Sequence, residues 1–214
     1  MKNIPLFSTE SGVASLVLEE IPYKHKAYVK LQSTQTPEQL LRECVDFCKA
    51  VGADAVLATG HEYLNQYPVY SELIRMRCKS ANILPSDLTL ISVEDNTLQL
   101  WCDLYNTKMH KVSNASTMTV QKLKKLTTEK SCYFVCDDQE TVGIGMITSG
   151  SVEAIASLVP GMGTDIMGAL CGRLEDEYVT VEVARSNVPA VKLYEKLGFI
   201  ETEIISTWYS VYNI

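Results

Sequence analysis

The chain has 214 residues, of which 46% are hydrophobic and 21% charged, so it can bury a sizeable core and is not expected to be disordered. Its net charge of -7 disfavours nucleic acid as a partner, because phosphates would be repelled. No stretch approaches the roughly 20 apolar residues of a membrane span, and the N-terminus lacks the cationic start and apolar run of a signal peptide. We therefore expect no membrane partner and a cytoplasmic location.

The seven cysteines form no Cys-x-x-Cys pair. Three histidines are scattered along the chain, and none lies at a spacing that would complete a zinc site with the cysteines. In a reducing compartment the cysteines would remain thiols and act as small buried hydrophobes. The sequence therefore predicts no metal site.

The N-terminal third contains the run "TPEQLLRECVDFCKAVGADAVLATG". Thr36 has the character of an N-cap, Pro37 suits the first helical position, and Gln39 completes a capping box. Gly52 supplies a left-handed stop after the helix. Apolar runs before and after this helix predict a strand, helix and strand over residues 27–60, the unit that makes two parallel neighbours.

The middle of the chain combines helix formers around residues 98–109 with turn formers on both sides. The following run "SCYFVCDDQETVGIGMI" has two apolar stretches joined across "DDQE". This pattern predicts a β-hairpin.

The C-terminal part repeats the strand, helix and strand order. "EAIASLVP" predicts a strand, "GTDIMGALCGRLEDE" a helix and "YVTVEVA" a β-branched strand. The chain should then end in two strands, "IETEII" and "TWYSVYNI". Either chance or an old duplication explains the likeness of the two strand–helix–strand units.

Between these last strands lies "NVPAVKLYEKLGF". Asn187 suits the N-cap of a helix, Pro189 falls in the first turn, and Gly198 falls at the left-handed position after the last turn. Phe199 is expected to fold back on Tyr194. On this basis alone, Tyr194 could be a core aromatic residue with its hydroxyl at an edge.

This run, preceded by "YVTVEVA", resembles the last conserved motif of the GNAT superfamily of acetyl-CoA-dependent acyltransferases. The resemblance implies an α/β (α+β) fold: a mixed, mostly antiparallel sheet with splayed central parallel strands flanked by helices, plus an N-terminal β-α-β lobe. The GNAT acetyltransferase domain would span residues 84–214, and residues 1–83 would form a partial GNAT-like lobe.

The resemblance also implies acetyl-CoA as cosubstrate. Its pantetheine arm would lie between the strands "EAIASLVP" and "YVTVEVA", and its pyrophosphate on the loop before the helix "GTDIMGALCGRLEDE". Glycines and a helix start make such a loop a good anion site. The residues implied in cofactor binding are Leu158, Val159, Gly161, Met162, Gly163, Thr164, Asn187, Ala190 and Tyr194.

Three features of the loop depart from the family pattern. Leu158 stands where family members have Arg or Gln, and the loop is shortened because Pro160 abuts Gly161. Asp165 would oppose a pyrophosphate from the first turn of the helix. Arg185 or Lys192 could meet the phosphates instead.

Acyl transfer to an amine needs a base for the amine and an acid for the departing thiolate. The resemblance assigns the acid to Tyr194. For the base we favour Glu153 on the cofactor strand over Glu182 on its neighbour, although either glutamate could simply face solvent.

We therefore expect an N-acetyltransferase that moves an acetyl group from acetyl-CoA to a primary amine of a small molecule or peptide. The alternative is a non-catalytic CoA-binding or scaffold module with a decayed phosphate loop. The aromatic C-terminus suits an acceptor pocket, a homodimer interface or plain sheet packing. The sequence does not identify the acceptor.

Overall fold

The computed structural model describes residues 2–127 and 131–213. The chain forms two compact units, one of residues 1–72 with 204–214 and the other of residues 73–203. The sequence placed the boundary after residue 83 instead. The difference arises because strand β5 (Val69–Lys79) and strand β11 (Ile200–Asn213) each contribute residues to both units.

The N-terminal unit is a sheet with its helix α2 on one face. Its hydrogen-bonded strand order is β1-β2-β3-β4-β11, and only β3 and β4 are parallel to each other. The other elements of this unit are β1 (Ile4–Thr9), β2 (Gly12–Val17), α1 (Ile21–Lys24), β3 (Lys26–Thr34), α2 (Pro37–Ala50), β4 (Ala55–Thr59) and the 3-10 helix η1 (Glu62–Gln66). The predicted strand–helix–strand unit is confirmed as β3, α2 and β4.

Helix α2 packs on this sheet through Leu40, Leu41, Cys44 and Cys48, all of which are buried. The predicted capping box is wrong, because the Thr36 side chain makes no cap hydrogen bond. Its hydroxyl donates instead to the carbonyl of Ser11, 3.3 Å away. The long-range contact with the β1–β2 turn therefore replaces the local cap.

The second unit is a mixed sheet with helices on both faces. Its strand order is β11-β5-β10-β9-β8-β7-β6, and its neighbours are antiparallel except for β9 and β10. The elements not yet introduced are the 3-10 helix η2 (Ser80–Asn82), β6 (Thr89–Ser92), α3 (Leu98–Met109), α4 (Val120–Leu126), β7 (Ser131–Asp137), β8 (Glu140–Thr148), β9 (Ser151–Ser157), α5 (Gly163–Cys171), β10 (Tyr178–Ala184) and α6 (Val188–Lys196). The expected mixed, mostly antiparallel sheet with flanking helices is confirmed.

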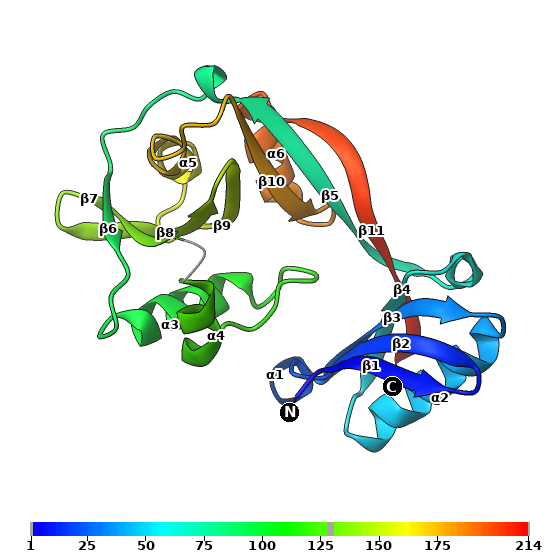
Figure 1. Ribbon diagram of the computed structural model, residues 1–214. Coiled ribbons are helices and arrows are strands. Elements are labelled where there is room, and N and C mark those ends of the chain that lie inside the picture. Colours follow the sequence, from blue (N-terminus) through cyan, green and yellow to red (C-terminus); the bar gives the residue numbers. More distant parts are fainter. Residues whose placement is uncertain (1, 128–130, 214) are drawn as a thin grey trace. The chain divides into compact units, whose positions relative to one another are not determined.

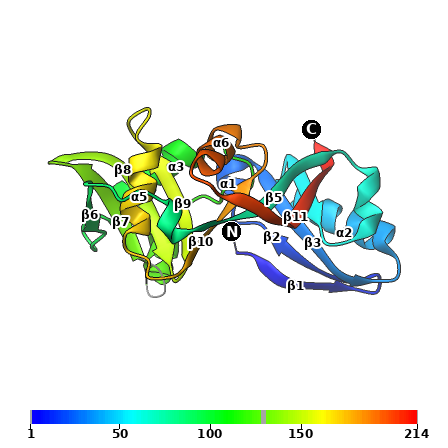
Figure 2. The same ribbon diagram turned by 90° about the horizontal axis from the view of Figure 1, so that it is seen from above.

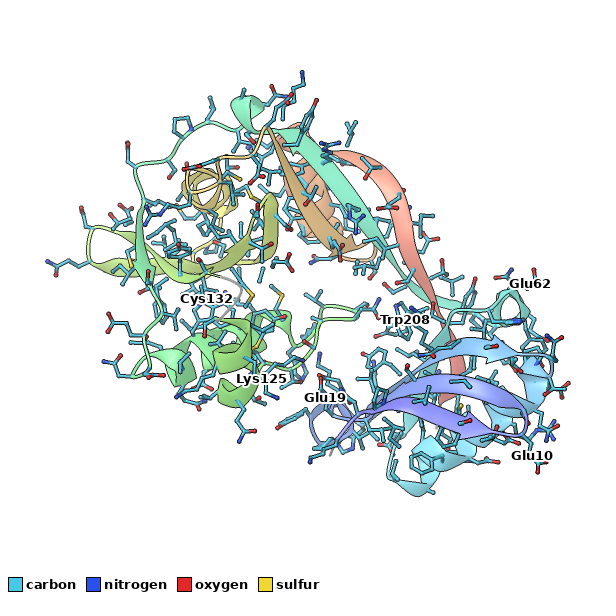
Figure 3. The ribbon with its side chains drawn as sticks, in the orientation of Figure 1. Glu10, Glu19, Glu62, Lys125, Cys132 and Trp208 are labelled. Atoms are coloured by element: carbon cyan, nitrogen blue, oxygen red, sulfur yellow. The ribbon has the colours of Figure 1, made fainter. Side chains whose placement is uncertain are left out.

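Two hydrophobic cores lie on opposite faces of this second sheet. Helix α5 covers one face of β8 and β9, while α3 and α4 cover the other (Figures 1 and 2). Cys132 belongs to the core on the α3 and α4 side (Figure 3). On the α5 side, an added Cβ at Gly145 would lie 2.4 Å from the Leu170 side chain, which would then have to move. The helix can therefore approach the sheet closely.

The hairpin predicted at "DDQE" is confirmed as β7 and β8, and its turn contains Asp138 at φ 50°. The two predicted closing strands are wrong, because residues 200–213 form the single strand β11. No glycine, proline, asparagine or aspartate interrupts this stretch before Asn213, so nothing in it favours a turn. The β1–β2 hairpin, β5 and β6 were not predicted.

The described part of the chain contains no helix long and apolar enough to cross a membrane. All seven cysteines are free and buried.

Replacing Leu170, which is fully buried against the sheet, by alanine should lower the free energy of unfolding by about 2–5 kcal/mol, since the cavity left behind collapses only in part. The measurement is urea denaturation followed by tryptophan fluorescence in a Trp208→Phe background, where Trp101 of the second unit is the remaining tryptophan. The control Leu100→Ala, at a leucine that is 55% exposed, should change stability by less than about 0.5 kcal/mol. Equal effects would contradict the assigned packing.

Candidate functional site

The two parallel strands of the second unit separate soon after they begin. Their recorded pairing is limited to Ser151 with Thr180 and Val152 with Val181. Strand β9 has a bulge at the next residue, since its register with β8 shifts: Ile147 lies opposite Val152, whereas Met146 lies opposite Ala154. A bulge bends a strand and increases its twist. The C-terminal ends of β9 and β10 are thereby freed from each other, as the expected splay requires.

A cavity of about 330 Å³ lies at this separation, within the range of small-molecule sites. Its walls come from β5, β9, β10, the C-terminal half of α3, the segment after α3, the start of α5, and α6. Among the described residues that line it, Glu153 and Glu182 carry charge and none is lysine, arginine or histidine. The cavity therefore favours a cation over an anion.

Glu153 occupies the bulge and lines the cavity. Its side chain is exposed, and one carboxylate oxygen accepts a hydrogen bond of 3.1 Å from the hydroxyl of Thr148. Bulges commonly redirect a side chain beside an active site. The position therefore suits a carboxylate that must meet a ligand.

Glu182 also lines the cavity, on the face of β10 opposite to Val181 and Val183, as strand alternation predicted. Its carboxylate lies 2.8 Å from the guanidinium of Arg75, which pairs with Glu203 as well. The Glu182 carboxylate is therefore engaged by Arg75 at the border of the cavity.

Tyr194 is 5% exposed and reaches the same cavity from α6. The end of α6 is formed as predicted: Gly198 has φ 86°, and the N–H of Phe199 donates to the carbonyl of Tyr194 at 3.0 Å. The two rings pack with centroids 5.6 Å apart. Burial raises the pKa of the Tyr194 hydroxyl, with a smaller contribution from Cys171, so the phenol stays protonated at neutral pH.

Asn187 stands at the N-cap position of α6, but its side chain makes no cap hydrogen bond, which corrects the prediction. Pro189 lies in the first turn as expected. Asn187 and Ala190, one turn on, both line the cavity. The Asn187 side chain thus does not cap the helix, and the residue borders the cavity.

The loop from β9 to α5 has the features of a backbone anion site. Gly161 has φ 91°, and nothing lies within 4 Å of where its Cβ would be. The N–H groups of Gly163 and Thr164 begin α5 and have no acceptor among the described residues. Asp165 lies in the same first turn, where its charge opposes an anion.

Basic side chains contribute little to this anion site. Arg185 makes a two-pronged ion pair with Glu201, with both N–O distances 2.8 Å, and is therefore engaged away from the loop. Lys192 is exposed, and the neighbouring Leu193 is the residue that packs against Gly163. Backbone N–H groups are thus the main donors that the loop offers.

The predicted site residues fall into three groups. One cavity brings together Glu153, Gly163, Asn187, Ala190 and Tyr194. Val159 and Met162 line a second, shallower pocket beside the acidic β7–β8 turn. Neither pocket lining includes Leu158, Gly161 or Thr164.

Sequence reasoning missed the wall formed by α3 and the segment that follows it. Tyr105 and Met109 lie one helical turn apart and line the cavity, as do residues 112–116. For Tyr105 and Met109 the sequence did contain a signal, because residues four apart on a predicted helix lie on the same face. The turn formers in "KVSNAS" indicated a loop, yet nothing in the sequence indicated that this loop lines the same cavity as β9.

The N-terminal strand–helix–strand unit has no comparable gap between its parallel strands. Strands β3 and β4 pair continuously from Lys26 with Ala55 to Lys30 with Thr59. Helix α2 begins with Pro37 and Glu38, which removes one N–H donor and adds a negative charge. This unit therefore shares the order of elements without the cleft.

Metal-binding geometry was not found: among the described residues, no group of three or more His, Cys, Asp or Glu side chains could hold an ion.

No family model and no curated protein matches the chain. Several solved structures are similar to the chain. A conserved Staphylococcus epidermidis protein of unknown function is 11% identical, with 97% of this chain and 93% of that one covered and a TM-score of 0.62. A GCN5-related N-acetyltransferase from Sphaerobacter thermophilus is 13% identical, with coverage of 92% and 74% and a TM-score of 0.55. A tandem GNAT protein from the clavulanic acid biosynthesis pathway is 11% identical, with coverage of 94% and 78% and a TM-score of 0.53.

Identities this low concern the fold alone. The neighbours are mostly GCN5-related N-acetyltransferases, so the chain has the GNAT-like fold that the sequence resemblance implied.

The raised pKa of Tyr194 predicts a pH dependence of stability. In the unfolded chain a phenol ionises near pH 10, whereas the folded state keeps this proton to higher pH. The free energy that the protonated Tyr194 hydroxyl contributes to folding is therefore fully present below about pH 10 and is lost as the pH rises further. Between about pH 9 and about pH 11, Tyr194→Phe should lose less free energy of unfolding than the wild type in urea denaturation. Parallel losses would mean that the hydroxyl is solvated in the folded protein.

Proposed function

We propose that this GNAT-fold chain is an N-acetyltransferase that moves an acetyl group from acetyl-CoA to a primary amine of a small molecule or peptide. One observation carries the proposal: the cavity where β9 and β10 separate is lined by Glu153, Asn187 and Tyr194 together. A buried phenol and an exposed carboxylate around one cavity supply the acid and the base that acyl transfer to an amine needs.

The residues present fit acetyl-CoA in two respects. The separated strands leave backbone groups and the Asn187 side chain to bind the pantetheine arm. Gly161 offers open space, and Gly163 and Thr164 offer N–H groups at a helix start, with no acceptor among the described residues, to bind the diphosphate. Leu158, Val159, Met162 and Ala190 would complete the contact surface.

The chain's own residues would then divide the proton transfers between them. Acetyl-CoA supplies the thioester-linked acetyl group. Glu153 accepts a proton from the amine, and the bulge of β9 directs it into the cavity for this purpose. Tyr194 donates its hydroxyl proton to the sulfur, and its burial keeps that proton in place until then.

The competing function is a non-catalytic CoA-binding or scaffold module. Two observations favour it: Asp165 lies in the first turn of α5, and Arg185 is paired with Glu201. Both weaken the attraction for a diphosphate. Neither affects the cavity that contains Tyr194, and for this reason we prefer the enzyme. The free, buried cysteines support our further proposal of a cytoplasmic location.

The loop charge should set the affinity for acetyl-CoA. Asp165→Asn removes the opposing carboxylate and should tighten binding about threefold at low salt, with a smaller gain at high salt. Thr164→Glu adds a carboxylate in the same turn and should weaken binding about tenfold or more. Isothermal titration calorimetry of each variant measures both effects.

The matched control for these titrations is Glu175→Gln, an exposed acid beyond the C-terminal end of α5, which should leave the affinity unchanged. If the wild type binds no acetyl-CoA at millimolar concentration, the transferase proposal fails and the scaffold alternative stands.

Removing only the Tyr194 hydroxyl should separate catalysis from binding. Tyr194→Phe keeps the ring that packs on Phe199, so the dissociation constant for acetyl-CoA should stay within about twofold while kcat falls about 100-fold. Glu153→Gln should likewise lower kcat with little change in that dissociation constant. Both are checked by initial rates of thiol release with an accepted amine.

A Tyr194→Phe variant with wild-type kcat would exclude the hydroxyl as the proton donor. A Glu153→Gln variant with wild-type kcat would move the base to another residue or to water.

A further inference from the structure

The segment between α3 and α4 contains an asparagine whose side chain lacks partners. Asn114 lines the cavity and has a left-handed backbone, with φ 63°. Its side-chain nitrogen and oxygen are both buried, and neither has a hydrogen-bond partner among the described residues. A buried polar group without a partner costs about 1–3 kcal/mol, so an unpaired carboxamide at a cavity wall indicates that a ligand supplies the partners.

A second asparagine nearby shows what a purely structural role requires. The Asn106 side chain donates to the carbonyl of Met118 and accepts from the N–H of the same residue, both at 2.8 Å. It thereby joins α3 to the residues before α4. Asn114 makes no such bonds, although it belongs to the same connection.

The charges around the cavity limit the ligand that could satisfy Asn114. Glu153 and Glu182 line the same cavity, and among the described lining residues no side chain is cationic. A ligand carboxylate would be repelled by both acids. A neutral group with one N–H and one C=O side by side would satisfy both atoms of the Asn114 carboxamide without that repulsion.

We propose that Asn114 determines acceptor specificity by binding an amide group next to the amine that receives the acetyl group. The acceptor class is then an amino amide, such as the N-terminal end of a peptide, in preference to a free amino acid. This inference rests on the proposed function. The side-chain nitrogen and oxygen of Asn114 are buried in this structure, so the side chain must rotate toward the cavity to bind the amide.

The experiment compares glycinamide, glycine and propylamine as acceptors of acetyl groups from acetyl-CoA. Asn114→Gly is the informative variant, because glycine adopts a positive φ without strain and removes only the carboxamide. It should lower kcat/KM for glycinamide about tenfold, mostly through KM, and change that for propylamine less than about twofold. The wild type should prefer glycinamide to glycine.

A matched variant separates recognition from folding. Asn106→Ala removes two hydrogen bonds, so it should lower the melting temperature and leave the ratio of glycinamide to propylamine rates as in the wild type. Asn114→Gly should instead lower this ratio without lowering the melting temperature. If Asn114→Gly matches the wild type with all three amines, the asparagine serves its backbone conformation and the inference is overturned.

A binding measurement keeps this inference separable from the enzymatic proposal. Ligand-observed NMR of glycinamide with the wild type and with Asn114→Gly reports recognition without turnover. Binding that depends on Asn114 without acetylation would overturn the transferase and keep the amide site. Acetylation of all three amines without regard to Asn114 would keep the transferase and overturn the amide site. Absence of both would overturn both.

Discussion

The bulge at Glu153 is the constraint on which the site depends. A parallel pair of strands can stay hydrogen-bonded along its length, as β3 and β4 do from Lys26 to Lys30. Strands β9 and β10 stop pairing at Val152, directly before the extra residue. The same residue therefore interrupts the pairing, leaves backbone groups available to a ligand, and presents a carboxylate to the space that results. A β9 with regular pairing would offer none of the three.

Packing on the α5 side keeps this opening in place. Tyr194, Phe199, Leu170 and the buried residues of β10 form one core, so the end of α6 is fixed against the strand that borders the cavity. The Gly198 turn directs Phe199 back onto Tyr194, and the sheet glycine at position 145 lets α5 approach closely. The tyrosine hydroxyl thus projects from a rigid ring, which suits a proton donor better than a side chain free to rotate.

Much of the second unit was predictable because its signals are local. Helix α6 ends at a glycine with positive φ, and the β7–β8 turn contains a residue that tolerates a positive φ. Alternating β-branched residues predicted β10. All three predictions were confirmed. Predictions failed where a distant partner decided the outcome. Thr36 bonds to Ser11 instead of capping its helix. The division of the final strand into two failed for a local reason, since residues 200–213 contain no Gly, Pro, Asn or Asp before Asn213.

The sequence by itself determined the order of elements from β7 to α6, including the helix that carries Tyr194 and the glycine-containing loop before α5, because apolar periodicity and turn residues act over a few positions. Only the tertiary structure decided that Glu153 lies in a bulge, that Arg75 engages Glu182, and that Asn114 reaches the cavity wall. These facts depend on strand register and on contacts between segments far apart in the chain. A single sequence carries no local signal for either, because register is fixed by the side chains of neighbouring strands.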